Sequence, residues 1–100
     1  MKLVDELKSK QSELATWRQH LHANPEIAYE EKDTSNFVAA KLESFGVEVH
    51  RGFGGTGLVG VIHGNQGDPD SGKAIGLRAD MDALPISEKT NLAYASQRPG

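Results

Sequence analysis

Two carboxylates and a guanidinium stand at alternate positions of one segment, as Arg78, Asp80 and Asp82. With the two-residue period of a β-strand, these three side chains point to one face, and the apolar side chains between them point to the other. Pro85 cannot donate a hydrogen bond to a sheet, so the strand predicted over 74–81 ends before it. Open α/β sheets place their chemistry at the carboxyl ends of strands. This segment is therefore the candidate functional site.

An Asp-x-Asp pair at the end of a strand is compatible with three roles. In a structural role, Arg78 pairs with Asp80, and Asp82 caps the next turn. In a magnesium-dependent phosphatase, Asp80 would be the nucleophile and both carboxylates would face a hard cation, although Ala-Leu-Pro after Asp82 is unusual for that class. In the third role, an aspartate orients a metal ligand or bridges a metal from beside it. Spacing alone leaves all three open, and a small α/β module without enzymatic activity is a further alternative.

A first amphipathic helix is predicted over residues 3–23, because apolar side chains recur there at helical spacing. Asn24-Pro25 ends it, since proline disfavours the helical conformation in the residue before it. His20 and His22 lie near this end, but residues two apart do not share a helix face and make a poor metal-binding pair. We interpret them as imidazoles favoured by the dipole at the helix C-terminus.

A second helix is predicted from residue 31 or 33 to Phe45, with Gly46 as its left-handed stop. Three carboxylates precede it, and they are interpreted as the solvated start of the helix, because acids suit an N-terminal turn. These residues are Glu26, Glu30 and Glu31.

Three strands are predicted after the helices. Alternation favours a strand over 47–50, with His50 on the same side as Glu48. The largely apolar segments 58–63 and 74–81 are predicted to pair as a long hairpin. The fold class is therefore α/β, with two helices followed by a strand and a β-hairpin of a central mixed sheet.

The glycines in the segment 52–57 match the spacing G-x-G-x-x-G of dinucleotide-binding loops. That motif must open a helix, whose N-terminus holds the pyrophosphate. A β-rich segment follows here instead, so we interpret the glycines as a loop between strands and expect no nucleotide to bind.

The composition is that of an ordinary globular chain of 100 residues, with a formal net charge of −3. A nucleic-acid-binding protein would usually show a basic excess. No apolar run approaches the roughly 20 residues of a membrane span, and the N-terminus lacks the apolar core of a signal peptide. The absence of cysteine excludes disulfides and thiolate ligands within these residues. We expect a cytoplasmic location, and neither nucleic acid nor a membrane as partner.

The order and spacing of three segments are informative: Trp17–Glu26, Thr56–Val61 and Leu77–Gly100. Together they resemble the metal-dependent N-acyl-amino-acid amidohydrolases, a family that includes hippurate hydrolase, N-acetyldiaminopimelate deacetylase and the plant auxin-conjugate hydrolases. The resemblance covers about residues 14–100, in order and at the expected spacing. Asn91 and Ala93 stand where Gly and Pro are more usual. The matching segments are Trp17–Glu26, which resembles the family's Leu-His-x-x-Pro-Glu motif, Thr56–Val61, which resembles its first hairpin, and Leu77–Gly100, with Glu88 and Thr90.

This resemblance implies a zinc-peptidase-like hydrolase of two domains, with two divalent metal ions (Zn, Mn, Co or Ni), a metal-activated water and a glutamate base. Its substrate would be a small N-acyl amino acid, and the complete enzyme could form a homo-oligomer. The family's metal ligands follow Pro99-Gly100, so residues 1–100 are expected to be the N-terminal portion of one catalytic domain. We therefore expect no metal on these residues and no activity from them alone. Asp82, with Asp80, is expected to support the ligands rather than to bind the metal.

Overall fold

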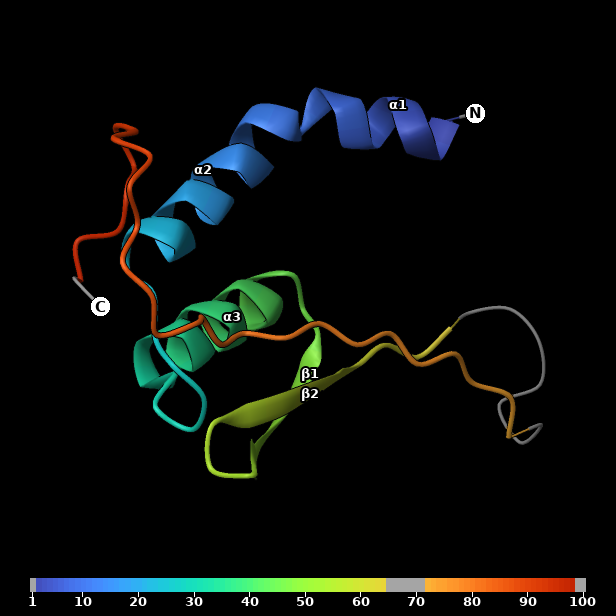
Figure 1. The fold of residues 1–100 in the computed structure, drawn as a ribbon. Helices are drawn as coiled ribbons and strands as arrows, with labels where there is room; N and C mark the ends of the chain where they lie inside the picture. Colours follow the sequence, from blue (N-terminus) through green and yellow to red (C-terminus); the bar gives the residue numbers. More distant parts are fainter. Residues whose placement is uncertain (1, 65–71, 99–100) are drawn as a thin grey trace. The chain divides into compact units, whose positions relative to one another are not determined.

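The computed structural model of the chain describes residues 2–64 and 72–98. In chain order its elements are the helices α1 (Lys2–Ser9), α2 (Gln11–Ala23) and α3 (Lys32–Ser44), then the strands β1 (Glu48–Phe53) and β2 (Gly57–Val61) (Figure 1). The predicted α/β class is confirmed. The chain divides into two compact units, of which one joins the residues up to Pro25 with those from Ala83 onward, and the other is Glu26–Asp82. None of the described helices has the length and apolar character that a bilayer span requires.

The single helix predicted over 3–23 is two helices, interrupted at Lys10. The Ser9 hydroxyl donates to the Glu6 carbonyl at 2.6 Å, which is the carbonyl that the Lys10 N–H would use in a continuous α-helix. The Lys10 N–H bonds instead to the Leu7 carbonyl, at 3.1 Å. The prediction of one helix is therefore wrong at this position, because a serine side chain competes with the backbone.

Helix α3 matches the predicted helix and begins and ends on specific contacts. Its end is a Schellman motif: the Val47 N–H bonds to the Leu42 carbonyl and the Gly46 N–H to the Glu43 carbonyl, both at 3.0 Å. Gly46 has a φ of +79°, the left-handed conformation in which a side chain is strained. The predicted stop at Gly46 is thus confirmed.

Replacement of Gly46 by Ala is expected to destabilise this unit by about 1 kcal/mol, because an L-residue pays a penalty in the left-handed region. No atom lies within 4 Å of a Cβ built there, so the effect comes from the backbone conformation alone. The urea midpoint of the variant measures the loss of stability. Gly64→Ala is the matched control, because a Cβ there also meets no neighbouring atom and the φ of Gly64 lies outside the left-handed region. Equal midpoints for the two variants would contradict this account.

Strands β1 and β2 pair antiparallel as a hairpin, with Glu48 opposite Val61 and His50 opposite Val59. The glycine-rich segment is the turn of this hairpin, so a strand follows it, as predicted. At its end a Cβ on Gly57 would lie 2.5 Å from the Phe53 carbonyl oxygen, and this close approach requires glycine. The segment resembles a nucleotide loop only in its spacing, because here the glycines let two strands reverse direction.

The predicted pairing of 58–63 with 74–81 is wrong in the described structure, where β2 pairs with β1 and residues 74–81 form no strand. The side chains expected to be buried there are open to solvent, since Ile75 is 92% and Leu77 97% exposed. Alternation indicates which face a strand would bury, but a strand also needs a neighbour to satisfy its backbone groups. The predicted turn at 64–72 lies almost wholly outside the described residues.

Candidate functional site

The predicted site residues lie on an exposed stretch of chain. Arg78 Nη2 lies 2.9 Å from Asp80 Oδ1, and both side chains are largely open to solvent. This is the pairing that the structural interpretation expected, and an exposed ion pair of this kind contributes little to stability. Asp82 is also exposed. The supporting role of both aspartates stays a prediction.

No group of three or more metal-ligating side chains assembles in residues 2–64 and 72–98. His50 lies beside Glu48 as predicted, with Nε2 2.9 Å from the carboxylate, and this hydrogen bond is the main cause that lowers the pKa of Glu48. The described residues therefore offer carboxylates and imidazoles in pairs, and not the set of ligands that would hold a metal ion.

Two of the three acids between α2 and α3 are buried, contrary to the sequence interpretation. Glu26 is 7% exposed, and its carboxylate accepts hydrogen bonds from the N–H groups of Asp33, at 3.2 Å, and Thr34, at 2.6 Å. These N–H groups belong to the first turn of α3, which has no partners for them inside the helix. Glu26 thus caps α3 from a position before the helix. The prediction that an acid is favoured near this helix N-terminus was correct, whereas the prediction that it is solvated was wrong.

Glu31 ties the start of α3 to the hairpin turn. It is 6% exposed, and its carboxylate accepts the Tyr29 N–H at 2.6 Å and the hydroxyl of Thr56. Tyr29 has a φ of +67°, which is costly for an aromatic residue, and the hydrogen bond to Glu31 stabilises this turn. Glu30, between them, is exposed as predicted.

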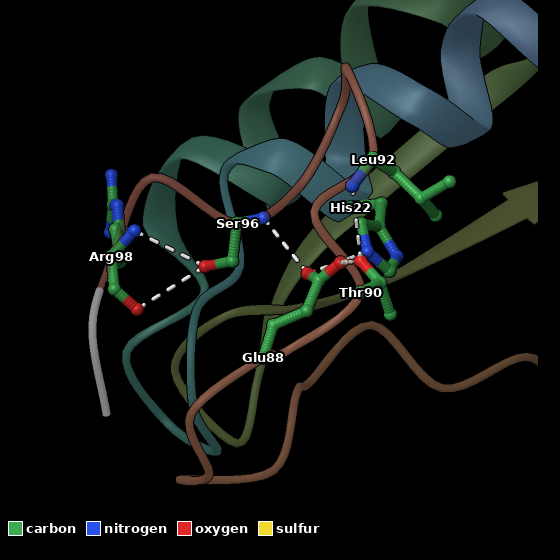
Figure 2. Close-up of polar contacts among 6 residues, drawn as sticks. All are labelled: His22, Glu88, Thr90, Leu92, Ser96 and Arg98. Carbon is green, nitrogen blue, oxygen red and sulfur yellow. Dashed lines mark hydrogen bonds and ion pairs between the residues drawn. The ribbon is translucent and has the colours of Figure 1, made fainter.

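In the other unit, a cluster of polar contacts surrounds Glu88 (Figure 2). Its carboxylate accepts the Ser96 N–H at 2.8 Å and the hydroxyl of Thr90, and His22 Nε2 lies 2.8 Å from it. The Thr90 hydroxyl and the Ser96 N–H are the largest causes that lower the pKa of Glu88, with smaller contributions from His22. Glu88 is therefore held in its ionised form by donors from two parts of the chain.

An aromatic contact adjoins this cluster. The rings of His22 and Tyr94 meet edge to face, with centroids 5.5 Å apart, and the Arg18 guanidinium lies 5.4 Å from the centroid of Tyr94. Arg18 and His22 are four residues apart and so share one face of α2. The Gln97 N–H also bonds to the Ala23 carbonyl, at 2.9 Å. Residues 88–97 are thus fastened to one side of the C-terminal half of α2.

Reasoning from the residues missed the pairing of His22 with Glu88. The two are 66 positions apart, and no local pattern relates an imidazole on a helix to a carboxylate in a loop. Both residues belong to the segments that carry the family resemblance. That coincidence was the only signal in the sequence that could have selected them.

Comparison with known proteins shows relatives along nearly the whole chain. Hippurate hydrolase of Campylobacter jejuni is 47% identical over 98 residues, which are 98% of this chain and 24% of that protein. N-acyl-L-amino acid amidohydrolase of Geobacillus stearothermophilus is 41% identical over 100 residues, which are 99% of this chain and 25% of that protein. No family model matches the chain.

A solved structure agrees with these relatives. A protein of methicillin-resistant Staphylococcus aureus, described as an aminohydrolase, matches 98% of this chain with a TM-score of 0.80 and 38% sequence identity. The match covers 25% of that protein. The chain thus spans about a quarter of the length of the relatives it matches. By sequence and by structure, it belongs to the amidohydrolase family that these proteins represent.

Proposed function

We propose that the protein hydrolyses the amide bond of small N-acylated amino acids, releasing a carboxylate and a free amine. One observation carries this proposal: 47% identity to a hippurate hydrolase along 98% of the chain. One relative is named as a hippurate hydrolase and another as an N-acyl-L-amino acid amidohydrolase, and these names favour amide hydrolysis over the phosphatase and over a module without activity. Residues 1–100 would be a portion of one catalytic domain of this enzyme.

The proposed activity includes divalent metal ions, of which Zn, Mn, Co and Ni are the candidates. The described residues do not assemble a ligand set for them, so the ligands would come from other parts of the protein. Asp82, and Asp80 beside it, would support those ligands. A carboxylate that accepts the second N–H of a metal-binding histidine fixes its tautomer and raises its basicity. The exposed carboxylate of Asp82 leaves room for such a histidine. A cytoplasmic location and self-association of the protein stay predictions of the sequence.

The protein encoded by the natural gene is expected to hydrolyse N-acetyl and N-benzoyl amino acids, and the 100-residue chain alone is expected to be inactive. Its described residues assemble no group of three or more metal-ligating side chains, and a metal-activated water needs such a centre. Ninhydrin detection of the free amine, with each candidate metal added in turn, measures the activity of the encoded protein and of the 100-residue chain. Calorimetric titration of the 100-residue chain with zinc and manganese is the accompanying control. Turnover by the short chain, together with stoichiometric metal binding, would contradict the prediction, and inactivity of the encoded protein with every metal would contradict the proposed function.

A further inference from the structure

We propose that Glu88 is a positioning residue, which closes residues 88–96 into a loop and holds this loop on the C-terminal turns of α2. That the loop affects amide hydrolysis rests on the proposed function. The loop itself rests on the contacts around Glu88 and can be tested separately.

The closure of the loop depends on both carboxylate oxygens of Glu88. One oxygen, Oε1, accepts the Ser96 N–H at 2.8 Å and faces His22 Nε2, also at 2.8 Å. The other oxygen, Oε2, accepts the hydroxyl of Thr90. Hydrogen bonds to an ionised acceptor are about twice as strong as those between neutral groups. A side chain that takes three such contacts, and is only 16% exposed, is fixed in one position.

The rest of the loop is shaped for this closure. The Ala95 N–H bonds to the Leu92 carbonyl at 3.0 Å, which makes a turn between Thr90 and Ser96. Asn91 has a φ of +58°, and asparagine is among the residues that best tolerate this left-handed conformation. Turn and carboxylate together bring the Ser96 N–H back to Glu88, as Figure 2 shows.

The loop is docked through side chains that share one face of α2. His22 contacts both Glu88 and the ring of Tyr94, and the Arg18 guanidinium lies over the same ring. A guanidinium over an aromatic ring is attracted to the negative face of that ring. His22 therefore joins the polar and the aromatic contacts, and its removal disturbs both.

This loop begins six residues after Asp82, and the chain between them is short. Because only five residues join the two, closure of the loop limits the conformations open to the chain that leaves Asp82. A displacement of about 1 Å in a catalytic arrangement can lower the rate about 100-fold. Glu88 would thus act on hydrolysis through the position of this segment, without contact with the substrate.

Tryptic cleavage after Lys89 tests the loop directly. The Lys89–Thr90 bond lies inside the loop, and trypsin can cleave it only when the loop opens locally. His22→Leu leaves the sequence around the cleaved bond unchanged, so it gives the most direct comparison. Thr90→Val removes the hydroxyl that Glu88 accepts, and Thr90→Ser keeps it. Rates are divided by those for the same bond in the urea-unfolded protein. We expect cleavage about ten times faster in His22→Leu and Thr90→Val, and wild-type rates in Thr90→Ser and in Glu13→Gln, an exposed acid of α2.

The same variants of the naturally encoded protein are assayed with an N-acyl amino acid. We expect Glu88→Ala and Thr90→Val to lower kcat about 10- to 100-fold with less change in KM, and Thr90→Ser to restore kcat. An unchanged rate of cleavage after Lys89 in His22→Leu would overturn the proposal that these contacts hold residues 88–96 as a closed loop. Faster cleavage with unaltered kcat would show that the loop does not position the site, and would overturn the inference. An inactive wild-type protein would refute the proposed function, while the cleavage rates would still decide the loop.

Discussion

Replacement of Asp82 by Asn in the naturally encoded protein is expected to lower metal affinity or turnover about 10- to 100-fold, the usual effect of losing a carboxylate that orients a metal-binding histidine. The variant keeps the shape of the side chain and removes its charge. Stability should change by no more than about 0.5 kcal/mol, because the residue is exposed. Bound metal by atomic absorption, kcat/KM and the melting temperature measure the three quantities.

Two control variants separate Asp82 from its neighbours. Arg78→Gln breaks the exposed ion pair with Asp80 and leaves Asp82 unchanged. If Asp80 serves only that pair, Asp80→Asn and Arg78→Gln will behave alike and will keep turnover. If Asp80 shares the site, Asp80→Asn will behave like Asp82→Asn. Wild-type turnover and metal content in Asp82→Asn would show that this aspartate has no role at a metal centre.

Replacement of Glu26 by Ala is expected to destabilise the unit Glu26–Asp82 by about 1–3 kcal/mol, the penalty for leaving buried donors without an acceptor. The N–H groups of Asp33 and Thr34 lose the carboxylate that caps α3, and Thr34 is itself buried. Hydrogen exchange of a peptide that covers α3, followed by mass spectrometry, measures the loss locally, and urea unfolding measures it globally.

Glu30→Ala is the matched control for this prediction, because Glu30 is an exposed acid of the same connection. It removes an equal charge near the same helix end, so the difference between the two variants isolates the buried hydrogen bonds from the effect of the dipole. Glu26→Gln keeps one acceptor oxygen and should fall between them. Equal exchange in α3 for Glu26→Ala and Glu30→Ala would show that the cap does not stabilise the helix.

The sequence alone predicted the features that depend on local chemistry. Helix α3 and its stop at Gly46 follow from apolar spacing and from the conformational freedom of glycine. The rejection of a nucleotide loop at 52–57 rested on the strand that follows, and β2 confirms that strand. The interruption of the first helix at Lys10 was missed, because helical periodicity does not register one serine that competes for a carbonyl.

The tertiary structure decided what depends on partners far apart in the chain. Alternation in 74–81 predicted a strand, but pairing requires a neighbour, and β2 pairs with β1 instead. Glu26 and Glu31 were expected to be solvated, but both are buried, where Glu26 caps α3 and Glu31 links the start of α3 to the hairpin turn. The positions of charged residues in the sequence do not show which carboxylates will be desolvated in the fold. The contact between His22 and Glu88, which are 66 positions apart, likewise depends on the tertiary fold and not on local sequence. A sequence fixes side-chain types and local conformation, whereas contacts between distant residues exist only once the backbone has brought them within hydrogen-bonding distance.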